Sequence, residues 1–115
     1  MTMQPKTTRQ EGSRAAHIVV AARDLLTRQV NFLEGFRALV ALGYEPNGYD
    51  YAPGFSFIFW FNSVTAHLPD QAVRAQCTPA FLERSDAELK QFEVQYGDRI
   101  DQACRELLER FGKAT

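Results

Sequence analysis

The chain is poor in the residues that build metal centres and disulfide frameworks. It has two histidines, His17 and His67, and two cysteines, Cys77 and Cys104, and these lack the close paired spacing of structural zinc sites. The cysteines can form one disulfide at most, and the polar N-terminal stretch has no apolar segment typical of a secretory signal. We therefore expect two free thiols, no metal site and a cytoplasmic protein.

A glycine-rich phosphate loop and a long apolar run are also missing. Gly43, Gly48 and Gly54 lie among prolines and an asparagine, with no lysine placed to meet a phosphate, which is typical of turns. The apolar stretch at residues 55–64 is much shorter than the roughly 20 residues that span a bilayer. We predict no cofactor and no contact with a membrane.

Basic charge is not in surplus. The chain has 13 basic and 14 acidic residues, and no basic cluster of the kind that nucleic-acid binders present. Nucleic acid is therefore excluded as a partner. Between Arg37 and Arg74 there is no lysine or arginine, while Glu45, Asp50 and Asp70 are acidic and eight of the 14 aromatic residues lie there. The middle of the chain is acidic and aromatic.

Length and periodicity predict a single helical domain. A chain of 115 residues, 45% of them hydrophobic, can build one small core. The polar residues 1–13 are predicted to form a flexible tail, followed by a helical domain at residues 14–112. From an N-cap at Ser13, apolar residues recur every three or four positions, bend near residues 27–29, and end at Gly43, which we expect as a left-handed C-cap.

The last third of the chain predicts one long amphipathic helix. Thr78 suits an N-cap and Pro79 suits the first helical turn. Apolar residues then recur every three or four positions as far as Phe111, and acidic residues precede basic ones by four positions on the other face. Gly97 interrupts this pattern and indicates either a kink or a close packing contact.

The stretch FSFIFWFNSV, residues 55–64, is compatible with two folds. Its four phenylalanines alternate as in a strand, yet no other alternating run is joined to it by a hairpin turn, and an isolated strand leaves its backbone groups unpaired. We favour a helix that starts near Pro53, buries Trp60 and forms the centre of an all-α antiparallel bundle of about four helices. The alternative is an α+β fold with a short strand pair around residues 55–61.

Three motifs resemble a family of small, functionally uncharacterised bacterial proteins. They are EGFR at 34–37, LPDQAVR at 68–74 and PAFLERSDAE at 79–88, which match the patterns E-G-x-R, L-P-x-x-x-x-R and P-x-x-L-x-x-x-D-x-E. The family has an acidic run before its Leu-Pro, where this chain has NSVTAH at 62–67. The resemblance implies a helical fold and a bacterial cytoplasmic setting, and it implies no enzymatic reaction.

The sequence offers little support for catalysis. His67, Asp70 and Cys77 are close enough in sequence for a cysteine activated by a histidine, with Asp70 orienting the imidazole. A lone cysteine just ahead of a helix is more often a packing residue, so we predict no catalytic residue. A small enzyme or ligand-binding protein with a pocket near His67, Arg74 and Cys77 is kept as an alternative.

A set of charged residues next to the apolar stripe points to architecture. Glu34 and Arg37 are predicted to form partly buried ion pairs with Arg74 or Asp86. Such pairs without a cleft are more common as structural features than as catalytic groups. We therefore assign these four residues to structural ion pairs.

The loop YEPNGYDYAPG, residues 44–54, is the predicted functional surface. Tyrosine offers a large contact area at little cost in rotamer entropy, and an acidic rim attracts basic partners. The predicted partner-binding residues are Tyr44, Glu45, Tyr49, Asp50 and Tyr51. The leading hypothesis is a non-enzymatic protein-binding domain, most concretely an immunity protein that neutralises a basic toxin. A structural homodimer paired through the aromatic segment is a further alternative.

Overall fold

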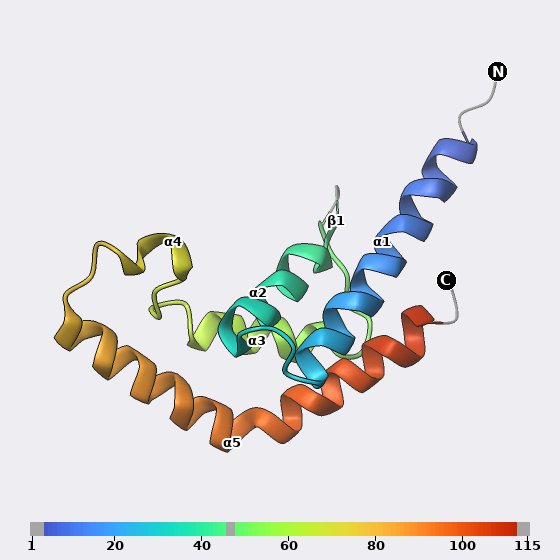
Figure 1. Cartoon of the computed structure of the whole chain (residues 1–115). Helices are drawn as coiled ribbons and strands as arrows, with labels where there is room; N and C mark the ends of the chain where they lie inside the picture. The colour runs from blue at the N-terminus through green and yellow to red at the C-terminus, as the bar shows by residue number, and fades with distance from the viewer. Residues whose placement is uncertain (1–3, 46–47, 113–115) are drawn as a thin grey trace.

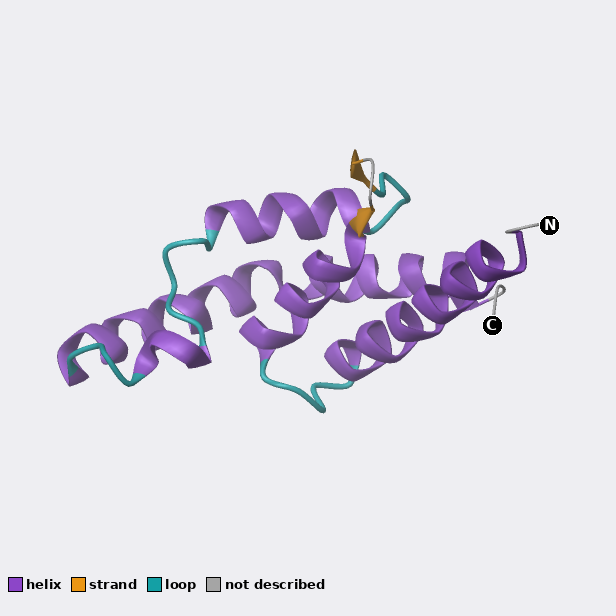
Figure 2. Ribbon diagram, turned by 90° about the horizontal axis from the view of Figure 1, so that it is seen from above, coloured by secondary structure: helices purple, strands orange, loops and turns teal. Residues whose placement is uncertain are grey.

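The computed structural model describes residues 4–45 and 48–112, with side chains for residues 13–44 and 50–112. The described residues form five helices: α1 (Gln4–Leu26), α2 (Phe32–Gly43), α3 (Phe55–Val64), α4 (Gln71–Arg74) and α5 (Pro79–Gly112). Two short strands, β1 (Tyr44–Glu45) and β2 (Gly48–Tyr49), pair antiparallel after α2. The predicted all-α bundle with a long C-terminal helix is confirmed (Figures 1 and 2).

The helices surround one core. α1 packs against both α5 and α2, while α3 packs between α2 and α5. Figures 1 and 2 both show the start of α1 and the end of α5 on the same side of the molecule. The molecule measures 59 × 29 × 23 Å. Its long axis follows α5, because 34 helical residues extend for about 50 Å. No helix in the described parts of the chain has both the length and the apolarity that crossing a bilayer requires.

The turn between α1 and α2 lies at the predicted bend and is held by Arg28. Gln29 N donates to Asp24 O at 2.8 Å and Arg28 N donates to Leu25 O at 3.1 Å, the bond pair of a Schellman motif. Arg28 has a φ of 56°, which is unusual for a residue with a side chain. Its guanidinium binds two carboxylates of α5, Glu93 at 3.0 Å and Asp101 at 2.9 Å. These bonds offset the backbone strain and fasten the turn to α5.

Residues 55–64 form helix α3, so the favoured prediction is confirmed and the strand pair around residues 55–61 is wrong. Phe55, Ile58 and Phe61 are buried at spacings of three residues, as one face of a helix requires. The short strand pair of this fold lies earlier, where Tyr44–Glu45 pairs antiparallel with Gly48–Tyr49. Two-residue strands are too short to show an alternating pattern, so the sequence does not predict them.

Helix α1 starts at Gln4, well before the predicted N-cap at Ser13. The predicted boundary at residue 13 therefore falls inside a helix. Pro5 occupies the first turn, where its missing N–H removes no helical hydrogen bond. The residues that follow are mostly polar and include good helix formers, and a prediction based on apolar periodicity does not detect a polar helical extension.

Gly43 ends α2 as predicted, but the left-handed C-cap is wrong. Gly43 belongs to the last helical turn, and Tyr44 after it is extended, with φ −80° and ψ 139°. A Cβ at Gly43 would lie 2.6 Å from Cζ of Phe59 and 2.9 Å from Cδ1 of Phe55. Glycine is therefore required here because α2 and α3 approach closely.

Trp60 lies at the surface, and the prediction that it is buried is wrong. Its side chain is 44% exposed. The stretch is apolar on every side, but α2 and α5 are its main packing partners and leave one side of α3 uncovered. A domain with so few helices cannot surround a helix on all sides, and Trp60 points to the uncovered side.

Candidate functional site

Exposed aromatic rings gather beside the end of α2 and over α3. Tyr51 is 75% exposed and Tyr44 is about half exposed. The Tyr44 ring leans on Phe59 of α3, with 5.6 Å between ring centroids. These three rings, together with Asn62 and Ser63, line a hollow of about 460 Å³. The predicted tyrosine loop therefore shares its surface with α3.

Trp60 extends this aromatic area toward α5. Phe59 and Trp60 are successive residues, so their side chains point about 100° apart around the helix. The Trp60 ring meets Tyr96 of α5 edge-on and also contacts Phe57, with 5.5 Å between centroids in both pairs. The Arg99 guanidinium stands 4.6 Å from the centroid of Phe57, a cation–π contact. We name one set of residues the α3 aromatic surface: Tyr44, Tyr51, Phe59, Trp60 and Tyr96.

The other predicted partner-binding residues are placed differently. Asp50 is turned inward: it pairs with Arg14 of α1 at 2.9 Å and accepts a hydrogen bond from Ala52 N at 2.8 Å. Its side chain is 14% exposed, so Asp50 anchors the loop to α1 and offers little surface to a partner. The sequence separates Asp50 from Arg14 by 36 positions, which hides the pairing. The side chains of Glu45 and Tyr49 lie outside the described residues.

Two of the four residues assigned to structural ion pairs, Arg74 and Asp86, pair with each other and not with Glu34 or Arg37 as predicted. Arg74 donates two parallel hydrogen bonds to Asp86, at 2.8 and 2.9 Å, and this bidentate pair lowers the pKa of the Asp86 carboxyl. Glu34 does not join it, since its Oε2 accepts a hydrogen bond from Gln71 N at 3.0 Å. Glu34 therefore holds the start of α4, and the pairing predicted for it is corrected. Both contacts tie α4 to its neighbours.

Arg37 also binds backbone instead of a carboxylate. Its Nη2 donates to Thr65 O at 2.9 Å and to Leu68 O at 3.0 Å, just beyond the end of α3. Carbonyl groups at a helix C-terminus lack intrahelical partners, and a basic side chain satisfies them well. Arg37 thus fixes the end of the helix that carries the aromatic surface, which corrects its predicted pairing with Arg74 or Asp86.

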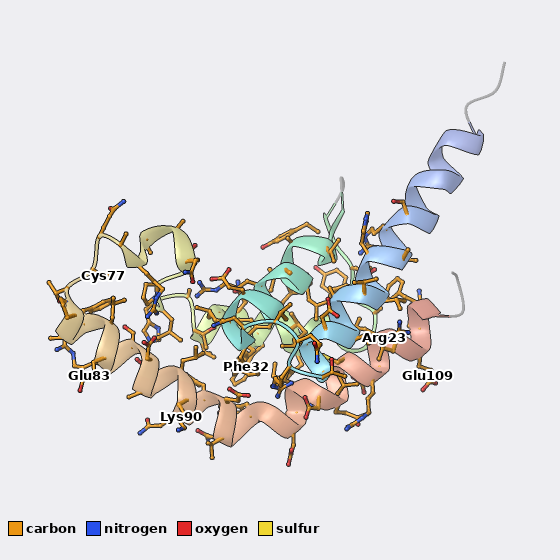
Figure 3. The ribbon with its side chains drawn as sticks, in the orientation of Figure 1. Arg23, Phe32, Cys77, Glu83, Lys90 and Glu109 are labelled. Carbon is orange, nitrogen blue, oxygen red and sulfur yellow. The ribbon has the colours of Figure 1, made fainter. Side chains whose placement is uncertain are left out.

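The residues of the alternative enzymatic site make other contacts. His67 Nε2 contacts Glu88 at 2.8 Å on the exposed surface, and Asp70 caps α4 instead of orienting the imidazole. Cys77 lies in the loop between α4 and α5, at the far end of the molecule in Figure 3. The hollow that contains Arg74 is lined by neither His67 nor Cys77. This hollow is therefore not the predicted pocket near His67, Arg74 and Cys77.

The remaining thiol is placed for packing. Cys77 and Cys104 are both free, as predicted. Cys104 is fully buried, and burial raises the pKa of its thiol to about 12, so it stays protonated at neutral pH. Within residues 4–45 and 48–112, no cluster of three or more His, Cys, Asp or Glu side chains is arranged to hold a metal ion.

Comparisons of this chain with protein-family models, with curated proteins and with solved structures find no match. The resemblance to the small bacterial family stays a prediction. We therefore infer the function from the geometry of this chain alone.

Proposed function

We propose that this chain is a non-enzymatic protein-binding domain whose partner covers the α3 aromatic surface. The observation that carries the proposal is the exposure of Tyr51 and Trp60 on either side of Phe59. Keeping large rings in water forgoes the free energy of burying them, and tyrosine and tryptophan are the residues most enriched among binding hot spots. The hollow between Tyr44, Tyr51 and Phe59 offers room for a side chain of the partner.

A bacterial cytoplasmic immunity protein that neutralises a basic toxin is the most concrete form of this proposal. It is supported by the absence of lysine and arginine between Arg37 and Arg74, the stretch that supplies most of the surface. The negative charge available to attract a basic toxin is smaller than the sequence indicates, because Asp50 is already paired with Arg14. The adjacent gene tests this form: we expect it to encode a toxin that binds the chain, and a neighbour that does not bind contradicts it.

A homodimer through the same surface is a second candidate, which the exposure of Trp60 favours. Sedimentation velocity separates the two candidates. If the parent chain is a dimer and Trp60→Ala dissociates it, the partner on this surface is a second copy of the chain. If the parent chain is a monomer, the partner on this surface is a different protein.

Tyr51→Ala is expected to weaken partner binding by about 2 kcal/mol, or about 30-fold in Kd, as truncation of a hot-spot tyrosine does. The free energy of unfolding should change little, because the side chain is 75% exposed. The partner is captured from a lysate of the native host, identified and purified, and its Kd for each variant is measured by isothermal titration calorimetry.

Val94→Ala is the matched control, since Val94 is an exposed apolar residue of α5 outside the α3 aromatic surface. This variant should bind the partner as the parent does. Equal affinities for the Tyr51 and Val94 variants would refute the proposal. So would unfolding of Tyr51→Ala, because the tyrosine would then be structural cover.

A further inference from the structure

A second hollow, of about 540 Å³, runs along the seam between α1 and α2 and is lined almost wholly by apolar surface. Its apolar lining includes Val20, Ala21, Val30, Ala38, Ala41 and Leu42. Val20 is 54% exposed and Val30 is partly exposed, so two branched apolar side chains stand in water at its edges. The hollow shares no lining residue with the α3 aromatic surface.

The groove follows from how closely the two helices pack. α1 and α2 run antiparallel, since Arg14 Nε donates to Leu42 O at one end while Gly35 meets Leu25 at the other. A Cβ on Gly35 would lie 2.9 Å from side-chain atoms of both Leu25 and Val30. Beyond this close approach the lining of α2 is mostly alanine, and side chains of that size leave the seam open.

The length of the groove matches a short helical segment. It extends along α1 from His17 to Asp24, which at about 1.5 Å per residue is roughly 10 Å, or two helical turns. Two turns of a docked helix present apolar side chains at positions i, i+3 or i+4, and i+7.

The charges of the lining are acidic at the end nearest the α1–α2 turn. Asp24 and Glu34 lie there, and no lysine or arginine belongs to the lining. Glu34 accepts one backbone hydrogen bond, from Gln71 N. The Asp24 carboxylate makes no hydrogen bond or ion pair with any residue that the structure describes. A partner that fits this groove therefore combines an apolar stripe with a basic residue.

We propose that the α1–α2 groove docks an amphipathic helix of a partner protein, with apolar side chains in the seam and a lysine or arginine beside Asp24. A second copy of this chain fits less well, because the lining of the groove has no lysine or arginine to meet Asp24 of the other copy. This groove is a second binding site, separate from the α3 aromatic surface. The Tyr51→Ala variant should therefore bind a helix in the groove as the parent chain does.

The probe is a fluorescein-labelled synthetic helix of about 18 residues, since shorter peptides are marginal helices in water. It carries leucine at helical spacing on one face and lysine on the others. A second peptide has glutamate in place of every lysine, and a third keeps the lysines but has serine in place of every leucine. Binding to the full chain is followed by fluorescence anisotropy at two salt concentrations.

We expect the leucine–lysine peptide to bind in the micromolar range and the other two peptides at least tenfold more weakly. Ala38→Trp fills the groove from an exposed position of α2 and should weaken binding at least tenfold. Ala87→Trp makes the same change at an exposed position of α5 and should have no effect. Asp24→Asn should weaken the lysine peptide several-fold at low salt and less at high salt.

Three results would overturn the proposal. One is that the leucine–lysine peptide fails to bind, and another is that Ala38→Trp binds it as well as Ala87→Trp does. The third is a dimer of the parent chain that Ala38→Trp dissociates, which would make the occupant a second copy. Ala41→Trp, at another exposed position of the lining, replaces Ala38→Trp if circular dichroism shows that variant to be unfolded.

Discussion

Phe61→Ala should lower the free energy of unfolding by about 4 kcal/mol, the largest stability loss that we expect from a single truncation in this chain. The Phe61 ring is fully buried, and its centroid lies 4.8 Å from that of Phe36 in α2 and 5.7 Å from that of Tyr96 in α5. Phe32 and Phe92 contact it from the same two helices. Removing the ring leaves a cavity at the centre of the α2–α3–α5 packing.

Urea denaturation followed by far-UV circular dichroism measures this loss. Phe61→Leu is the matched control, because it keeps most of the volume and should cost less than about 1.5 kcal/mol. A loss below about 1 kcal/mol for Phe61→Ala would mean that α3 is not the centre of the core. Near-equal losses for the two variants would argue against a close-packed ring at this position.

Gly54→Ala should cost about 3 kcal/mol, because alanine is strained there for two independent reasons. Gly54 has a φ of 101°, a conformation that side chains rarely adopt. A Cβ would also lie 2.7 Å from the carbonyl oxygen of Ala103 and 2.8 Å from Cγ of Leu107, both in α5. The residue that caps α3 therefore touches the α5 backbone directly.

Gly97→Ala is the control variant, and it should change the free energy of unfolding in the opposite direction. Gly97 lies within α5, and a Cβ there would be 3.7 Å from its nearest neighbour, Nη2 of Arg28, which is ordinary contact. Alanine should therefore raise the free energy of unfolding by roughly 0.5–1 kcal/mol through helix propensity. Both variants are measured in the same urea titration. An unchanged stability for Gly54→Ala would contradict the close approach of α3 and α5.

The helices with strong local signals were predictable from the sequence. Thr78 Oγ1 accepts a hydrogen bond from Phe81 N at 3.2 Å, as an N-cap ahead of Pro79 should, and α5 follows with its apolar stripe. The bend near residues 27–29 was also predictable from the break in periodicity. The positive φ of Arg28 at this bend was not predictable, because the two carboxylates that hold its side chain belong to the distant helix α5.

The candidate site was predictable in part. Tyr44 and Tyr51 are exposed as the turn-rich loop indicates, because a loop at the end of a small bundle lies at its surface. The inward turn of Asp50 depends on Arg14, a contact across distant parts of the chain. The exposure of Trp60 depends on how many helices cover α3, and no local pattern reports that number.

Trp60 can report directly whether a partner protein covers the α3 aromatic surface. It is the only tryptophan in the chain, so labelling the chain with 5-fluorotryptophan yields a single ¹⁹F resonance from that surface. An exposed ring shows a shift of this resonance between H₂O and D₂O. We expect the purified partner, at saturation, to move the resonance and abolish most of that solvent shift. An unmoved resonance with its full solvent shift in the saturated complex would show that the partner binds elsewhere on the chain.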